Sequence, residues 1–390
     1  MSDDEADPEL LELLRQSLGL KGASKAPIPA DTKVLKDAEY IYDNAIDVAL
    51  DPQKTKEAAE TIWERMKEQS YSIKTWAQHE LHPKTKNEAT VNFVFTMDLL
   101  NFSFWSTETD ESKRFAVEYR GKKWTGYWSL VAALQRALDE EIPITTPSFW
   151  CQEDECSDDL LKHVFRSATD EQMPLLEERI ACLREAGRIL NEEFDGTFLN
   201  CINEANRSAA VLVNLLAERF PCFRDEASLD GRRVRFYKRA QILVADLWAC
   251  FEGQGYGQFD DIDKLTMFAD YRVPQMLHSL GSLLYSPRLE SHIRRFEEIP
   301  SGSKWEIEIR GVSIWCVELI RREILRRHPE AAHMTYIQTS DNNNGDVTSE
   351  DKTIKLNAIL IDFFLYDAMK ALEKEGKESI PHHRTRSIWY

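Results

Sequence analysis

Apolar residues recur at intervals of three and four over most of the chain, which is the repeat of an α-helix that buries one face. The segments with this repeat, and therefore the predicted helices, are 38–49, 55–66, 127–138, 172–190, 203–220, 237–251, 314–327 and 356–373. No internal repeat or heptad array accompanies them. The pattern predicts a mostly α protein built as one compact multi-helix unit.

Two short segments alternate apolar and polar residues instead, which is the repeat of a β-strand. Residues 114–119 alternate in this way, a turn containing Gly follows at 120–122, and 124–127 can return as the second strand of a hairpin. Residues 304–310 alternate Trp, Ile and Ile with two glutamates, and we predict a strand there as well. A few short strands are therefore expected beside the helices.

Two polar stretches interrupt these patterns. Residues 1–33 are predicted to be a flexible acidic N-terminal tail, in which 10–20 can form one amphipathic helix and 21–29 has the composition of a linker. Residues 336–352, with an Asp-Asn-Asn-Asn-Gly run at their centre, are predicted to be a mobile loop. We therefore expect one domain over residues 34–390.

The charge of the chain disfavours one broad class of partner. Its 390 residues include 67 acidic and 49 basic ones, for a formal net charge of −18. Affinity for long nucleic acids comes largely from Lys and Arg side chains that displace counterions, so binding to long DNA or RNA is disfavoured. A single nucleotide held in a local basic pocket is compatible with this charge.

The sequence also indicates a compartment. No run of about 18 apolar residues is present, so no membrane span is expected, and the acidic start lacks the pattern of a signal peptide. Seven cysteines, an odd number lying mostly in apolar or helical segments, are predicted to be reduced and buried. We expect a cytoplasmic protein, with the nucleus as the alternative.

Two motifs match known binding sites only in part. His79 and His82 lie three residues apart rather than four, and no third ligand follows at a recognisable spacing. We therefore expect no metal, and a structural or surface role for His82. The glycines at 253, 255 and 257 follow a predicted helix rather than a strand, so they are expected to form a tight hairpin between two helices instead of a dinucleotide loop.

Charged residues inside apolar segments are the better candidates for chemistry. Asp270 lies between Met-Phe-Ala and Tyr, a context that suits a buried functional carboxylate. An ion pair with Arg272 or a helix cap is the alternative. Lys238, Arg239 and Asp246 lie in an otherwise apolar predicted helix, and each needs a partner, a ligand or solvent.

The C-terminal part of the chain supplies further candidates. Asp362 and Asp367 share a predicted helix but lie about 140° apart around its axis, so they need not serve one site. Each could accept hydrogen bonds from a ligand or face solvent. Arg384 and Arg386 could hold a phosphate through forked hydrogen bonds, or belong to a packed or frayed end. Residues 91–105 are dense in aromatics, which indicates either core or a wall for base stacking.

Several segments together resemble the queuosine salvage proteins, which are queuosine 5′-phosphate N-glycosylases. They are 100–105, 126–130, 142–145, 236–246, 267–272 and 309–311, and the resemblance runs from about residue 35 to residue 390. The N-terminal extension and the polar insertion near 342–344 depart from the family's pattern. The resemblance implies a mostly helical fold similar to that of the helix-hairpin-helix DNA glycosylases. It also implies an enzyme that hydrolyses the N-glycosidic bond of queuosine 5′-phosphate and frees queuine for tRNA modification.

The resemblance further implies roles for individual residues. Asp270 corresponds to the catalytic carboxylate that follows the hairpin in those glycosylases, and Asp261 is the second choice. The residues implied to line the queuine pocket are His79, Phe268, Asp362 and Asp367. Water completes the reaction, so no metal or organic cofactor is expected. From their charge, the candidates for binding the 5′-phosphate are Lys238, Arg384 and Arg386.

Three other functions stay open from the sequence. A DNA-repair glycosylase of the helix-hairpin-helix type is disfavoured by the net charge of −18. A noncatalytic scaffold that binds a nucleotide would be distinguished by the absence of turnover. An enzyme that prefers free queuosine over its 5′-phosphate would be distinguished by comparing the two substrates.

Overall fold

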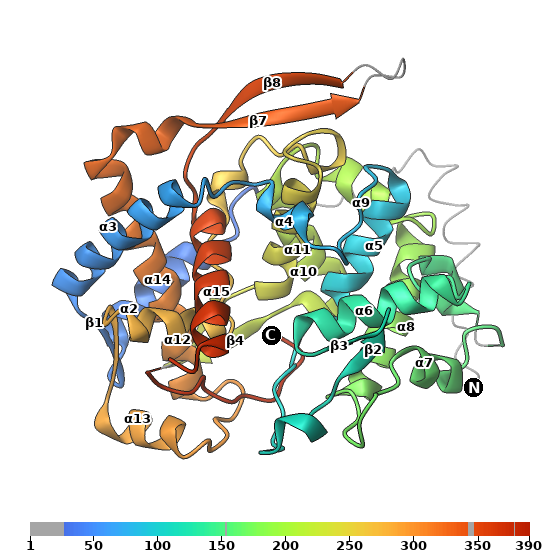
Figure 1. Ribbon diagram of the computed structural model, residues 1–390, viewed down its shortest axis with the longest axis horizontal. Helices are drawn as coiled ribbons and strands as arrows, with labels where there is room; N and C mark the ends of the chain where they lie inside the picture. The colour runs from blue at the N-terminus through green and yellow to red at the C-terminus, as the bar shows by residue number, and fades with distance from the viewer. Residues whose placement is uncertain (1–26, 153, 342–346, 378) are drawn as a thin grey trace, which may run out of the picture.

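The structure is a computed structural model that describes residues 27–152, 154–341, 347–377 and 379–390 (Figure 1). The helices are α2 (Val34–Asn44), α3 (Pro52–Glu68), α4 (Thr75–Gln78), α5 (Glu88–Leu99), α6 (Tyr127–Asp139), α7 (Asp158–Val164), α8 (Leu176–Glu193), α9 (Phe198–Glu204), α10 (Ala209–Arg219), α11 (Lys238–Cys250), α12 (Arg272–Ser279), α13 (Pro287–Arg294), α14 (Lys304–Arg327) and α15 (Ala358–Lys374). The strands pair antiparallel in twos: β1 (Val48–Leu50) with β6 (Leu283–Tyr285), β2 (Val117–Tyr119) with β3 (Lys122–Trp124), β4 (Glu226–Leu229) with β5 (Arg232–Arg235), and β7 (Met334–Asp341) with β8 (Val347–Ile354). The prediction of a mostly α fold with a few short strands is confirmed.

Side chains at the helix starts fix where several helices begin. Asp51 accepts hydrogen bonds from the backbone N–H groups of Gln53 and Lys54, and Pro52 occupies the first turn of α3. Asn357 caps α15 in the same way through the N–H of Leu360. Such caps satisfy N–H groups that have no partner inside the helix.

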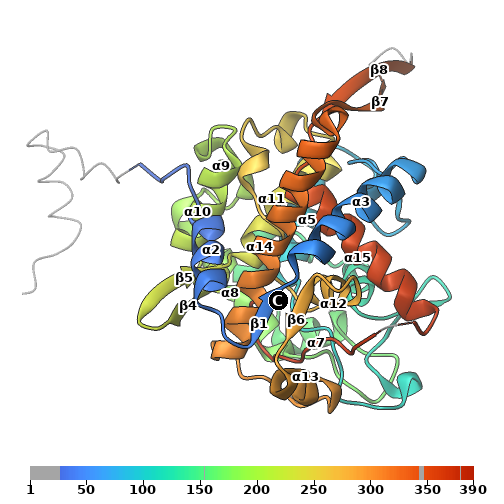
Figure 2. The same ribbon diagram turned by 90° about the vertical axis from the view of Figure 1, so that its left-hand side faces the viewer.

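Helix α14, with 24 residues, runs through the body of the molecule and packs against α2, α3, α12 and α15 (Figure 2). Its close approach to α2 depends on Gly311, since a Cβ atom there would lie 2.5 Å from Cδ1 of Ile41. Helix α11 is equally central, because it packs against both α5 and α10 and every residue in it except Ile242 is buried. These two helices carry several of the buried charged groups, among them Lys238 and Asp246 on α11 and Arg310 on α14.

The strand predicted at 304–310 is wrong, because this segment is the first part of α14. Glu306 and Glu308 alternate with apolar residues as in a strand, but both are buried and accept hydrogen bonds inside the protein. Glu308 Oε2 accepts from the backbone N–H groups of residues 46–48, and Glu306 Oε1 accepts from Arg310 at 3.2 Å. A helix segment that is buried on all sides has no polar face, so its sequence does not show the helical repeat of apolar and polar residues.

The mobile loop predicted at 336–352 is also wrong in its described part. Strands β7 and β8 pair from Met334 with Ile354 to Asp341 with Val347, and the hairpin extends away from the helical body in both views (Figures 1 and 2). Its tip, 342–346, lies outside the described residues. A two-stranded ladder needs only backbone donors and acceptors, so polar composition alone did not reveal it.

The glycine segment does not form the tight hairpin that we predicted. Residues 251–271 separate α11 from α12 and contain the 3-10 turns Gly255–Gly257 and Ile262–Lys264. Gly257 packs directly on the Leu247 carbonyl of α11, where a side chain would collide with that backbone. The segment therefore follows α11 closely before it reaches the start of α12.

Other predictions differ from the structure in detail. The helix predicted at 203–220 is two helices, because Asn206 and Arg207 have positive φ and Ser208 caps α10. The predicted hairpin after residue 114 is present as β2 and β3, and the remaining predicted helices are present with shifted ends. All seven cysteines are free, and all but Cys151 are buried. No helix within the described ranges has the length and apolar character needed to cross a membrane.

The start of the chain is partly attached to the domain. Asn214 Nδ2 donates hydrogen bonds to the carbonyl oxygens of Pro29 and Asp31, and Lys264 Nζ donates to that of Ala30. The predicted boundary at residue 33 therefore falls within a segment that contacts α10. The helix predicted at 10–20 lies outside the described residues.

Candidate active site

A cavity of about 460 Å³ opens between α4, α6, α11, α12 and α15. Six of the predicted site residues line it: His79, Lys238, Phe268, Asp270, Asp362 and Asp367. The other charged side chains in its lining are Asp246, Arg272 and Lys370. Aromatic residues make up much of the remaining wall, among them Trp76, Phe102, Tyr127, Trp128, Tyr271 and Tyr390. Segments far apart in the sequence thus meet around one aromatic and acidic site.

Asp270 lies at the start of α12 and is half-buried in the cavity wall. Its Oδ1 accepts hydrogen bonds from the backbone N–H groups of Arg272 and Val273, at 2.9 and 3.0 Å. Burial raises the pKa of Asp270, while the nearby Lys238 ammonium opposes that rise. The side chain of Arg272 instead pairs with Glu373 at 2.7 Å. Asp270 is therefore both a helix cap and a cavity carboxylate, and it is not the ion-pair partner of Arg272.

Lys238, the first residue of α11, is only 6% exposed. Burial lowers the pKa of its ammonium group, whereas the charges of Asp270, Asp98 and Asp362 oppose that fall. Its backbone N–H donates to Asp225 Oδ2 at 3.0 Å, which anchors the start of the helix. A cation is thus held among acids at the inner side of the cavity.

Asp362 and Asp367 both face the cavity although they lie about 140° apart on α15. Phe363 and Tyr366, at intermediate angles, line it too, so the cavity spans a wide arc of this helix. Asp362 is buried and accepts from the Phe268 backbone N–H at 2.9 Å, and burial raises the pKa of its carboxyl. Asp367 is exposed at the rim and accepts from the Tyr71 hydroxyl at 2.7 Å.

Two histidines of the cavity lining stack on tryptophans. His79 stacks on Trp128 with ring centroids 3.3 Å apart, and His82 stacks on Trp76 at 3.7 Å. His82 Nδ1 donates to the Trp76 carbonyl oxygen and Nε2 accepts from the Tyr127 hydroxyl, each at 2.7 Å. Burial lowers the pKa of His82 to about 3, so it is neutral. These contacts favour the structural role expected for His82, which also lines the cavity.

Comparison with known proteins identifies the family at this point. The family model described as queuosine salvage protein matches residues 81–390. The chain belongs to the queuosine salvage protein family. The resemblance found in the sequence is thereby confirmed.

Relatives of this family member align over most of its length. A protein of Nematostella vectensis is 42% identical over 358 residues, covering 91% of this chain and 97% of the relative. One of Schizosaccharomyces pombe is 43% identical over 372 residues, covering 92% and 100%. A bacterial one, of Sphaerobacter thermophilus, is 38% identical over 357 residues, covering 92% and 97%. Each of these relatives is named queuosine 5′-phosphate N-glycosylase/hydrolase.

Asp261, the second choice for the catalytic carboxylate, lies outside the cavity lining of this family member. Its Oδ1 accepts from the Ala209 backbone N–H at 2.6 Å and its Oδ2 accepts from the Ser208 hydroxyl at 2.8 Å. Both groups belong to the start of α10. Asp261 therefore stabilises a helix end, and the structure does not support it as a catalytic group.

Arg384 and Arg386 also lie outside the cavity lining, which does not favour the predicted contact of these two side chains with a phosphate. Arg386 donates to the Ser103 hydroxyl and the Trp105 carbonyl oxygen, and its guanidinium lies 3.5 Å from the centroid of the Trp105 ring. Arg384 lies over Trp105 and Phe296, at 5.5 and 4.7 Å. These arginines attach the C-terminal segment to the body. The cavity contains Arg272 and Lys370 instead, which sequence reasoning missed.

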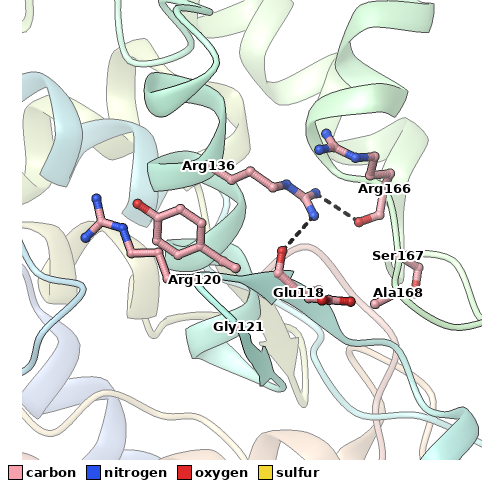
Figure 3. A pocket seen from close by; sticks show the side chains of 8 residues that line it. Glu118, Arg120, Gly121, Arg136, Arg166, Ser167 and Ala168 are labelled. Carbon is pink, nitrogen blue, oxygen red and sulfur yellow. Dashed lines mark hydrogen bonds between the residues drawn. The ribbon is translucent and has the colours of Figure 1, made fainter.

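A second depression, on the surface beside β2, has three arginines nearby but little capacity to bind an anion (Figure 3). Arg136 donates to the carbonyl oxygens of Glu118, Val164 and Arg166, at 3.2, 3.0 and 3.0 Å. Arg120 and Arg166 each pair with an acid at the end of α6. All three arginines are therefore already engaged in hydrogen bonds or ion pairs within the protein. Within the described ranges, no three or more His, Cys, Asp or Glu side chains are arranged to hold a metal ion.

Proposed function

We propose that this family member hydrolyses the N-glycosidic bond of queuosine 5′-phosphate and releases queuine, which then serves tRNA modification. The names of the aligned relatives support this assignment. The observation that carries it is the half-buried carboxylate of Asp270 in the wall of an aromatic cavity. A volume of about 460 Å³ is in the range of sites for small molecules. The net charge of −18 favours a mononucleotide over a long nucleic acid as the substrate.

Asp270 is the proposed catalytic carboxylate. Departure of the base leaves positive charge on the ribose, in an oxocarbenium-like transition state. A fixed carboxylate in a site of low dielectric stabilises that charge far better than water does. Lys238 counteracts the effect of burial on the Asp270 pKa, which favours the ionised form that this role requires. Water then adds to the anomeric carbon, so the products are queuine and ribose 5-phosphate.

The acidic and aromatic wall is the proposed binding site for the base. Queuine is a 7-deazaguanine with a cationic aminomethyl substituent, and Asp362 and Asp367 supply carboxylates on one side of the cavity. His79 and Phe268 supply flat surfaces against which the ring can pack. The cationic substituent of queuine would be stabilised by these carboxylates. Guanine lacks this substituent and would gain no such stabilisation.

The 5′-phosphate is proposed to bind at the rim, next to Arg272 and Lys370. Both side chains pair with Glu373 and lie in the cavity lining. The Lys370 side chain is 43% exposed, so a phosphate there stays partly hydrated, whereas Lys238 is 6% exposed and faces acids. We therefore place Lys238 near the reacting carbon rather than the phosphate.

Comparing queuosine 5′-phosphate with queuosine tests this substrate assignment. We expect wild type to prefer the phosphate, and Lys370→Ala to lower its kcat/KM by about 10- to 100-fold, since a hydrogen bond to a charged group contributes about 1.5–3 kcal/mol. Turnover of queuosine should change little. Lys374→Ala, one turn further along α15 and exposed, is the matched control. Equal losses on both substrates would rule out a phosphate contact.

Residues 34–390 are proposed to form the catalytic unit. The family model and the cavity lining both lie inside this range. Because residues 29–31 contact α10 and the segment before α12, we expect a chain that begins at residue 27 to keep its turnover and melting temperature. A chain that begins at 34 should keep turnover with a slightly lower melting temperature. Loss of turnover in both would show that the preceding residues are needed.

A further inference from the structure

Two buried carboxyl groups meet beside the cavity and have no part in the reaction described so far. Asp98 lies on α5 and is 0% exposed, while Asp246 lies on α11, is 2% exposed and contributes to the cavity lining. The two helices pack against each other. Burying two acids side by side is costly unless they share a proton or face cations.

The surroundings of the two acids leave part of their hydrogen-bonding capacity unused. Asn101 Nδ2 donates to Asp98 Oδ1 at 3.0 Å, and the side chains of Trp76 and Asp246 are hydrogen-bonded. Asp98 Oδ2 receives no hydrogen bond from any N–H or hydroxyl group of the described residues. Asp98 and Asp246 are both buried on packed helices, and each affects the pKa of the other. Two negative charges buried close together repel each other strongly, so one of the two groups is expected to keep a proton.

The charges around the pair indicate which member keeps it. Burial raises the pKa of both groups, and the negative charge of Asp98 raises that of Asp246 further. The cations that oppose this are Lys238 and Arg239, and the Arg239 guanidinium already donates to the Leu99 and Cys222 carbonyl oxygens. The other titratable groups that interact with Asp246 are Tyr127 and Cys250. Asp246 is thus the protonated member, and it is the one at the cavity.

The proposed reaction needs a proton at this place. Cleavage of the bond from C1′ to the base nitrogen leaves the electron pair on the base. A 7-deazapurine has a carbon at position 7, so the usual protonation site of a purine leaving group is missing. Without a proton delivered elsewhere, the base departs as an anion, and general acid catalysis contributes about 10²–10⁴-fold in such steps.

We propose that Asp246, with Asp98 as its partner, is the acid that protonates the departing queuine. This inference rests on the proposed function. The C1′–N bond breaks, its electron pair goes to the base, and the Asp246 O–H proton goes to a ring nitrogen of the base. Water adds to C1′ and releases one proton, which restores the proton of the pair. Proton and charge balance over the cycle without any further reactant.

The pH dependence of the single-turnover rate tests the proposal on queuosine 5′-phosphate. The wild-type rate should fall at high pH, as the pair loses its proton. Asp246→Asn should reduce the rate by about 100-fold or more and lack this alkaline fall. Asp98→Asn should move the alkaline fall to lower pH by about one unit, because removal of the Asp98 charge lowers the Asp246 pKa. The control is Asp43→Asn, an exposed residue of α2, which should leave the profile unchanged.

A second substrate separates proton donation from a structural role. 4-Nitrophenyl ribofuranoside 5-phosphate releases a leaving group that needs no proton, so Asp246→Asn should cut its hydrolysis by less than about threefold. Equal losses on both substrates, or an alkaline fall that Asp98→Asn does not move, would overturn the proposal. If Asp246→Asn does not fold, the pH dependence of the Asp98→Asn rate alone decides whether the proposal holds. If the wild-type protein releases no queuine, the proposed function itself is wrong. That result is distinguishable from the variant results, which test only the role of Asp246.

Discussion

Replacing Asp270 by asparagine is expected to reduce the rate of queuine release by about 10³-fold, because it removes the negative charge that faces the ribose. The amide oxygen of asparagine can still accept the hydrogen bonds from the backbone N–H groups of Arg272 and Val273. The start of α12 should therefore remain folded, and binding of queuosine 5′-phosphate should persist. Single-turnover release and equilibrium binding, measured on the same preparation, distinguish the two effects.

The control for this variant is Asp261→Asn, since Asp261 lies outside the cavity lining and accepts hydrogen bonds from Ser208 and Ala209 at the start of α10. We expect it to lose at most about 1–2 kcal/mol of stability and to keep turnover within about threefold. If Asp261→Asn abolished release while Asp270→Asn retained it, the catalytic carboxylate would be misassigned.

Replacing Arg310 by alanine is expected to lower the free energy of unfolding by about 3–5 kcal/mol, the largest stability effect that we predict. Arg310 is buried in α14 and donates to Asp225 at 2.9 and 2.6 Å and to Glu306 at 3.2 Å. Its loss leaves two buried acids without their cation. Arg310 Nε also donates to the Ala269 carbonyl oxygen at 3.0 Å, so the segment before Asp270 should loosen as well. Urea unfolding followed by circular dichroism measures the effect.

A surface pair supplies the comparison. Arg188 pairs with Glu192 at 2.6 Å, but the two side chains are 60% and 54% exposed. Arg188→Ala should therefore change the free energy of unfolding by less than about 0.5 kcal/mol. A loss below about 1 kcal/mol for Arg310→Ala would show that the buried network contributes little to stability.

The helices could be predicted from the sequence where one face is buried and the other is exposed to solvent. The first part of α14 was missed, since Glu306 and Glu308 are buried polar residues that bind Arg310 and the backbone of residues 46–48. The pairing of β1 with β6 was missed for a similar reason. It joins segments more than 200 residues apart, and no local pattern reports such a contact.

The candidate site was predictable to the extent that charge in apolar sequence marks function. Asp270 and Lys238 were found in this way, and both line the cavity. Sequence does not show what an arginine binds, so Arg386 was assigned to a phosphate although it donates to Ser103 and Trp105. Asp98 was hidden in an aromatic segment, because its relation to Asp246 exists only after α5 packs on α11.

The most direct test is to incubate the wild-type protein with queuosine 5′-phosphate and to follow free queuine and ribose 5-phosphate by chromatography with mass detection. We predict that both products appear in equal amounts, over many turnovers, without added metal or cofactor. A folded protein that binds the nucleotide and releases no queuine would contradict the proposed hydrolysis, and would leave a nucleotide-binding protein in its place.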